Sequence, residues 1–254
     1  LVWASGGAFV WWVHRDRRGS AGAPSVIREI VTVALGVAAA AVVALVGAAT
    51  ALYAMLRVLV ETAAPLGSRL DTLPIGLALA LVGAAVWLLH ARSLRAGSGG
   101  AQLAARLIVS TLGLASAATG IGMLVATALD AAGAQIERSA TLQLALAGVS
   151  VLAVGGPTWW RAWQPRSSDV AGGAGSTARR VYLTVVFGLA ALVGLIAAVV
   201  VLTQVVDVAV SGVGADRLLR QISRPCGLFA ATGLVAGYHA LVWRRETAAA
   251  DVAA

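Results

Sequence analysis

The chain has 254 residues, of which 59% are apolar and only 12% are charged, and its net charge is +8. Soluble domains average about 45–50% apolar and about 25% charged residues, so the composition predicts an integral membrane protein. The positive charge does not indicate nucleic-acid binding, because that requires a basic face on a folded soluble domain. Cys226 is the single cysteine, which excludes an internal disulfide and a cysteine-based metal cluster.

The chain begins with an apolar run, Leu1–Val13, that is too short to cross about 30 Å of hydrocarbon at about 1.5 Å per residue. We interpret it as the exit half of a truncated span. Six complete runs follow, and each must be helical because lipid offers the backbone no hydrogen-bond partner. We predict spans at Ile30–Leu56, Leu73–His90, Leu103–Leu129, Leu142–Trp160, Val181–Val206 and Gly227–Trp243. The expected fold is an all-α, polytopic transmembrane bundle of seven spans, the first of them truncated.

The loops between these spans form two alternating sets with different charges. Residues 14–29, 90–106, 161–180 and the tail from residue 244 carry 13 arginines against five acidic residues, so this set holds the entire net charge. The other set has six arginines and six acidic residues and is neutral. By the positive-inside rule the first set lies in the cytoplasm. We therefore expect a multi-pass protein of the bacterial cytoplasmic (inner) membrane with a cytoplasmic C-terminus.

Tryptophan is concentrated at the same boundary as the arginines. Indole and guanidinium groups both favour the headgroup layer, so we predict an aromatic belt of interfacial anchors. Its members are Trp11, Trp12, Trp87, Trp159, Trp160, Trp163 and Trp243.

A helix-pair pattern recurs along the chain. Gly7 to His14 aligns with Gly83 to His90 after 76 residues, and Gly155 to Trp159 follows Gly83 to Trp87 after another 72. The pairs have the same orientation, which predicts parallel two-helix repeats. The expected units are the second helix of a truncated repeat at 1–21, helix pairs at 22–97 and 98–174, and a third pair with a cytoplasmic tail at 175–254.

Small residues four positions apart let helices approach closely in lipid. They occur at Gly113/Ala117, Ser116/Gly120, Ala190/Gly194 and Gly233/Gly237. Two explanations stay open here, a specific packing seam and the general abundance of alanine and glycine.

Few residues suggest chemistry. His14, His90 and His239 are the only histidines and could ligate haem, but interfacial hydrogen bonding is the interpretation that we favour, so no cofactor and no metal are expected. Residues 216–225 resemble a short amphipathic helix at the outer surface, whose Arg217, Arg220 and Arg224 could contact lipid phosphates. A solvated linker turn explains them equally well. No catalytic constellation can be assembled, so we do not expect an enzyme.

Two motifs point to a family. Helix pairs in this chain start with an Arg-Arg-x-Tyr motif, best seen at Arg179-Arg180-Val-Tyr182, and end with a Trp-x-x-His-x-Arg motif, best seen at Trp87-Leu-Leu-His90-Ala-Arg92. This pattern resembles a family of bacterial membrane domains, often in tandem, that is known as a domain of unknown function. The resemblance implies a polytopic bacterial protein and no catalytic residues.

Three functions remain open at this point. The first is a non-catalytic structural or accessory subunit of a larger bacterial membrane complex, with membrane lipids and other membrane-protein subunits as partners. The alternatives are a small-molecule or ion transporter that uses Gln143 or Gln204, and a haem-bearing redox subunit.

Overall fold

The computed structural model describes residues 30–62, 64–94, 98–132, 138–164, 173–212 and 214–253. Within these ranges the chain is helical and contains no strand. A π-helix, η2 (Thr32–Ala39), continues directly into α3, and the remaining elements are α-helices. In chain order they are α3 (Ala40–Val60), α4 (Leu66–Leu70), α5 (Leu73–Leu94), α6 (Gly99–Ala132), α7 (Arg138–Trp163), α9 (Gly173–Ser211) and α10 (Ala215–Ala253). The predicted span Leu1–Val13, with Trp11, Trp12 and His14, lies outside the described residues.

Six helical segments of the described chain are long and apolar enough to cross a membrane, which is compatible with a multi-pass membrane protein. They are Thr32–Val60, Leu66–Leu94, Gly99–Ala132, Ala140–Trp163, Thr177–Ser211 and Leu218–Arg245. Each overlaps one of the six complete spans expected from the sequence. Most extend past the predicted ends, because a helix continues to satisfy its own backbone hydrogen bonds beyond the apolar run.

The separate amphipathic helix expected at residues 216–225 is not present. Ala215–Ala253 is one continuous helix, α10, with Pro225 inside it. Proline removes one backbone hydrogen bond without ending the helix, which membrane helices tolerate when neighbouring groups satisfy the backbone.

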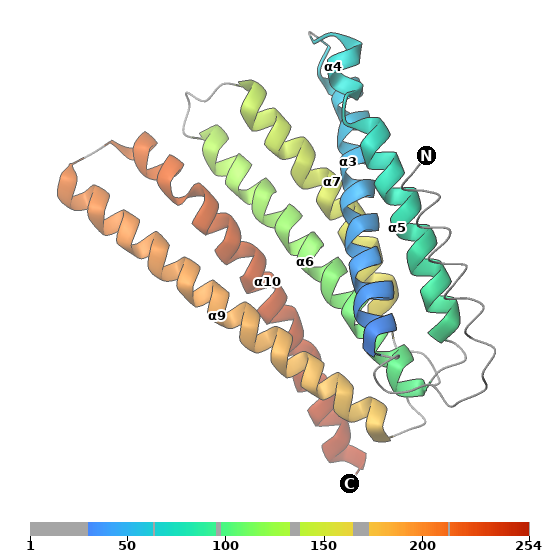
Figure 1. The fold of residues 1–254 in the computed structure, drawn as a ribbon. Coiled ribbons are helices and arrows are strands. Elements are labelled where there is room, and N and C mark those ends of the chain that lie inside the picture. Colours follow the sequence, from blue (N-terminus) through green and yellow to red (C-terminus); the bar gives the residue numbers. More distant parts are fainter. Residues whose placement is uncertain are drawn as a thin grey trace.

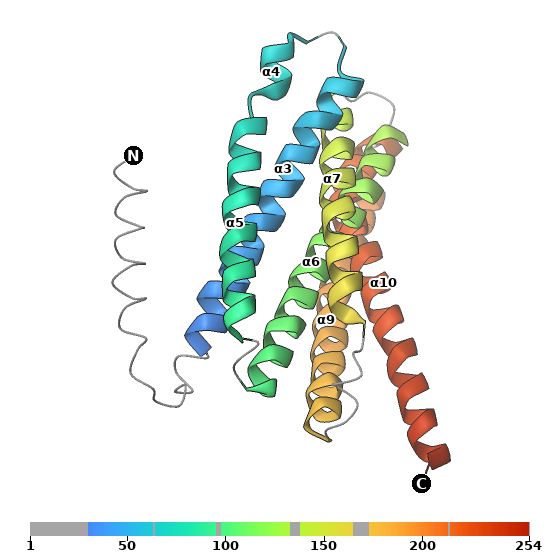
Figure 2. The ribbon, with the colours of Figure 1, turned by 90° about the vertical axis from the view of Figure 1, so that its right-hand side faces the viewer.

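Successive helices form three hairpins, α3/α5, α6/α7 and α9/α10 (Figure 1). Between hairpins, α3 packs against α7 and α6 packs against α10 (Figure 2). Helices α5, α7 and α10 end, and η2, α6 and α9 begin, at the same end of the bundle. We call it the arginine end, because it carries Arg92, Arg106, Arg161, Arg179, Arg180, Arg244 and Arg245. We call the opposite end the carboxylate end, because it carries Glu61, Asp71, Asp130 and Asp207.

Glycine lets the backbones of α6 and α7 touch. A Cβ atom placed on Gly155 would lie 2.6 Å from the Ala117 nitrogen, and one on Gly113 would lie 2.5 Å from the Trp159 nitrogen. No side chain fits at these distances, so the predicted seam through Gly113 and Ala117 is confirmed.

The third hairpin packs on a different face from the one that glycine spacing suggests. Gly233 and Gly237 are exposed, and a Cβ on either would meet no atom within 4 Å. Of the two explanations left open for these glycines, their contacts within the described chain do not support a packing seam. The face of α10 that meets α9 instead carries Thr232, whose hydroxyl oxygen lies 3.0 Å from a Cβ placed on Gly194.

At the carboxylate end, ion pairs connect the two helices of the first hairpin near their turn. Arg57 Nε lies 3.0 Å from Glu61 Oε2, as expected for an i,i+4 pair, and Arg57 also reaches Asp71 at 3.6 Å. Arg69 donates a hydrogen bond of 3.2 Å to the Val58 carbonyl oxygen. These contacts tie α4 back onto the last turns of α3.

Candidate functional site

The arginine end contains a group of buried and half-buried rings contributed by α7, α9 and α10. We call it the aromatic cluster and define it as Trp159, Trp163, Tyr182, Tyr238 and His239. Trp163 Nε1 donates a hydrogen bond of 2.9 Å to the Tyr238 hydroxyl. The ring centroids of Trp163 and Tyr182 are 5.3 Å apart, and those of Trp159 and Tyr238 are 5.2 Å apart in an edge-on arrangement. These are the spacings of favourable aromatic pairs, so the cluster fixes α7 against the third hairpin.

Polar contacts connect the aromatic cluster to its surroundings. The hydroxyl of Tyr182 lies 3.2 Å from Oγ of Ser110 on α6, and the Ser110 side chain is fully buried. The guanidinium carbon of Arg179 lies 4.2 Å from the centre of the Trp163 ring, which places a cation over an aromatic face. Four helices therefore contribute to this one region.

His239 is fully buried within the aromatic cluster. Its Nδ1 lies 2.8 Å from the Val235 carbonyl oxygen on the same helix. Since a carbonyl oxygen only accepts, Nδ1 carries the proton, and Nε2 is the acceptor in the neutral ring. Nε2 is buried and makes no hydrogen bond.

His90 makes the same local contact in a different place. Its Nδ1 lies 2.8 Å from the Val86 carbonyl oxygen, and its ring covers Gly36 of η2. His90 is therefore packed within the first hairpin and does not join His239. Among the described residues no three His, Cys, Asp or Glu side chains are grouped so that they could hold a metal ion.

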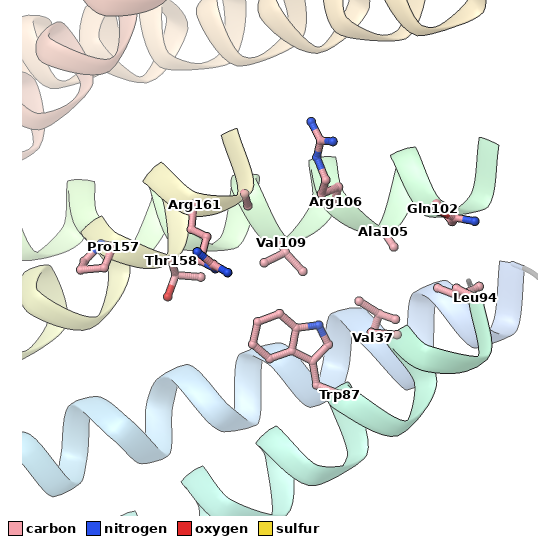
Figure 3. A pocket seen from close by; sticks show the side chains of 12 residues that line it. Val37, Trp87, Leu94, Gln102, Ala105, Arg106, Val109, Pro157, Thr158 and Arg161 are labelled. Atoms are coloured by element: carbon pink, nitrogen blue, oxygen red, sulfur yellow. The ribbon is translucent and has the colours of Figure 1, made fainter. Parts of the chain in front are cut away.

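A cavity of about 470 Å³ lies beside the aromatic cluster, between η2, α5, α6 and α7. Its walls are apolar at Val37, Trp87, Ala91, Leu94, Ala105, Val109, Pro157 and Ala162, and polar at Gln102, Arg106, Thr158 and Arg161. Figure 3 shows Arg161 extending from α7 on the side that faces Trp87, whereas Arg106 points away from Trp87. Arg106 donates a hydrogen bond of 3.2 Å to the Gln164 carbonyl oxygen, which holds it at the rim.

The charged residues that line this cavity are all positive. Arg161 and Arg106 are among the described residues that line it, and no Asp or Glu is. The guanidinium group of Arg161 is turned toward Trp87, whereas that of Arg106 points away from it. A guanidinium group keeps its proton in proteins, so the cavity suits binding of an anion and offers no general acid or base.

The tryptophans divide between two roles. Trp160 is 56% exposed and Trp243 is 43% exposed, as an interfacial anchor requires. Trp163 is only 5% exposed, so neighbouring side chains cover its ring. Its position around the α7 axis turns it toward α9 and α10, where it packs as a core residue. Trp87 and Trp159 are half-buried, the first against the cavity and the second in the aromatic cluster.

The arginines expected to contact lipid phosphates lie on the first turns of α10. Arg220 and Arg224 are exposed, and the side chain of Arg217 lies outside the described residues. Arg224 also lines a second cavity of about 380 Å³ at the carboxylate half of the bundle, mostly between α6 and α10. Apart from Arg224 its polar lining comes from Thr119 and Thr232.

The sequence does not reveal Arg106 and Arg161 as site residues. Both belong to the arginine-rich loops that set topology, and nothing in their local sequence distinguishes them from other arginines of that set. What singles them out is that α6 and α7 place them around the same cavity.

Comparison with known proteins gives a family and no function. Residues 104–234 match the model of a family described as a domain of unknown function (DUF5671). The match includes α6, α7, α9 and the first part of α10, and with them Arg106, Arg161, Trp163 and Tyr182. No curated protein and no solved structure is significantly similar to the chain. Because the matched residues make up just over half of the 254 residues, the chain belongs to the DUF5671 family.

Proposed function

We propose that this protein is a non-catalytic integral membrane protein that serves as a structural or accessory subunit of a larger bacterial membrane complex, in contact with lipids. The observation that carries the proposal is the way the described spans are packed. Glycine seams bring helix backbones together, and the ionisable side chains lie toward the helix ends. A transport pathway needs polar groups deep in the membrane. Gln143 and Gln204, the candidates for a transporter, line neither cavity described above.

The outward face of α9 supports contact with another subunit. The most apolar 18-residue stretch of the span Thr177–Ser211 has a mean hydropathy of 3.0, the highest value among the six spans, and the neighbours of this helix in the bundle cover only one side of it. Leu189, Leu192, Leu195, Ile196 and Leu202 are between 55% and 63% exposed. Such a face must be covered by lipid tails or by another membrane helix, and we assign part of it to another subunit.

Purification from native membranes in mild detergent tests the proposal. We expect the protein to copurify with at least one other membrane protein at a fixed ratio, and recovery as a single free species would contradict it. A photo-crosslinking amino acid at Leu195 sharpens the test, because an α9 interface should give one adduct of defined mass. The same group at Leu81, which is 70% exposed on α5, is the control for random collisions.

We also propose that the hairpins are parallel repeats with boundaries at 22–97, 98–174 and 175–254, preceded by the second helix of a truncated repeat at 1–21. Equivalent contacts support this. A Cβ on Gly83 would lie 2.5 Å from the Ala44 nitrogen and 2.9 Å from the Ala40 oxygen. In the next hairpin, a Cβ on Gly155 would lie 2.6 Å from the Ala117 nitrogen and 2.9 Å from the Gly113 oxygen.

The packing between hairpins repeats as well. In both interfaces the first helix of one hairpin lies against the second helix of the next, as α3 lies against α7 and α6 against α10. Alanine at Gly83 and at Gly155 should therefore lower the free energy of unfolding by similar amounts. A large effect at only one of the two positions would contradict the repeat.

We propose in addition that the arginine end faces the cytoplasm of a bacterial inner membrane, with the C-terminus on that side. The distribution of arginine supports this orientation. The predicted inner loops carry 13 arginines and the outer ones six, which is the asymmetry that the positive-inside rule associates with cytoplasmic loops.

A further inference from the structure

The cavity and the aromatic cluster occupy equivalent positions at the arginine end. The cavity lies between the first and second hairpins, and the aromatic cluster lies between the second and third. The proposed repeat pairs each position of one hairpin with a position of the next. A residue of α5 corresponds to the residue 72 positions later in α7, and a residue of the second hairpin corresponds to the residue 77 positions later in the third. Ala91, Ala105 and Ala162 line the cavity, and Trp163, Tyr182 and His239 are their counterparts in the aromatic cluster. Three alanines thus replace three rings, and this explains why one interface is filled and the other is hollow.

The remaining substitutions give the hollow its charge. Arg161 lines the cavity at the position that corresponds to Tyr238 of the aromatic cluster. Arg106 corresponds to Leu183, a buried residue packed beside that cluster. Trp87 keeps the place of Trp159 as an indole wall. This comparison rests on the proposed repeat, whereas the cavity, its volume and the two arginines among its lining residues do not.

The lining has the chemistry of a phosphate site. Guanidinium groups bind phosphate through paired N–H donors, and Gln102 and Thr158 add polar groups near the same walls. The apolar lining suits the glycerol and upper acyl region of a lipid, and basic pockets between membrane helices bind lipid headgroups. The volume of about 470 Å³ lies within the range of ligand sites, about 300–1,000 Å³.

We propose that this cavity binds a phosphate group, with Arg161 extending from α7 as the ligand and Arg106, held at the rim, adding a second positive charge nearby. The phosphate comes from the headgroup of an anionic phospholipid or from a soluble phosphate compound. The apolar walls and the position at the end of the spans favour the lipid. The site holds whether or not the protein is an accessory subunit, since its ligand is not another protein chain.

Native mass spectrometry of the full chain in mild detergent tests the proposal, with phosphatidylglycerol, phosphatidylcholine and inorganic phosphate as separate probes. We expect one phosphatidylglycerol per chain to bind preferentially over phosphatidylcholine. Arg161→Gln should weaken this binding about fivefold and the double change with Arg106→Gln about 30-fold, because an arginine near an anionic surface contributes about a factor of five in affinity. Arg180→Gln is the matched control, since Arg180 is exposed at the same end and does not line the cavity.

A second variant tests whether binding needs the space of the cavity as well as the positive charge of the arginines. Ala91→Trp keeps both arginines but places an indole ring in the cavity, at the position that corresponds to Trp163 of the aromatic cluster. This ring should abolish phosphatidylglycerol binding. Unchanged binding in folded Ala91→Trp or Arg161→Gln protein, or equal affinity for phosphatidylcholine, would overturn the proposal. Displacement of the lipid by inorganic phosphate at equal concentration would assign the site to a soluble phosphate compound. Copurifying subunits play no part in this measurement, so its failure is distinct from failure of the proposed function.

Discussion

Replacing Gly155 with alanine tests whether α6 and α7 are held together backbone to backbone. The new Cβ would lie 2.6 Å from the Ala117 nitrogen, 2.7 Å from the Ser116 Cβ and 2.9 Å from the Gly113 oxygen. Optimal contacts between carbon atoms lie at about 3.5–4.0 Å, so the two helices would have to separate by about 1 Å along the seam. Two of the three blocking atoms belong to the backbone, so no side-chain rotation relieves the clash.

The adjacent residue supplies the control that isolates this packing term. A Cβ on Gly156 would meet no atom within 4 Å. Both changes gain the same intrinsic helix propensity, up to about 1 kcal/mol, and this gain cancels when the two variants are compared. Overpacking costs about 1–3 kcal/mol, and we expect Gly155→Ala to be less stable than Gly156→Ala by that amount.

Unfolding in mixed micelles, followed by circular dichroism as the fraction of denaturing detergent rises, measures this difference. The two variants are compared in the same detergent, so the reference state is shared. Equal free energies of unfolding, or greater stability of Gly155→Ala, would refute the reasoning and with it the close approach of α6 and α7.

Two further predictions concern the aromatic cluster. Trp163→Ala should cost about 3–5 kcal/mol of unfolding free energy because the ring is buried, whereas Trp160→Ala, at a side chain that is 56% exposed, should change it by only about 0.5 kcal/mol; the same micelle titration compares them, and similar costs would contradict the core assignment of Trp163. Tyr182→Phe should cost about 0.5–1.5 kcal/mol by removing the hydrogen bond to Ser110. In a double-mutant cycle with Ser110→Ala the two effects should not add, and simple additivity would show that the hydroxyl groups do not interact.

The spans were predictable from the sequence, but the faces through which they pack were not. The length and apolar character of a run such as Val181–Val206 predict a helix that is able to cross a membrane, and the helix is present with the length and composition that this requires. Lipid tails and neighbouring helices are equally apolar, however, so hydrophobicity does not tell which side of a span is covered. Gly113/Ala117 and Gly233/Gly237 have the same spacing, yet the first lies in a seam and the second on an exposed face.

The candidate site depends on side chains that a single sequence does not distinguish. Trp163 and Trp160 are three residues apart in the same motif, and only their positions around α7 separate a core ring from an interfacial one. The cavity depends on small residues at Ala91, Ala105 and Ala162, and small residues are abundant throughout this chain. Its volume becomes visible only when α5, α6 and α7 are placed together.

Labelling of single cysteines in intact spheroplasts most directly tests the central claim, that these helices cross a membrane with the arginine end in the cytoplasm. Cys226→Ser removes the single native thiol, and cysteine is then placed at Gly67 in α4 or at Gly99 at the start of α6, both exposed positions with open space around the new Cβ. A membrane-impermeant maleimide should label the Gly67→Cys protein in intact spheroplasts and the Gly99→Cys protein only after the membrane is disrupted. Labelling in the reverse order, or of both proteins before disruption, would contradict the account.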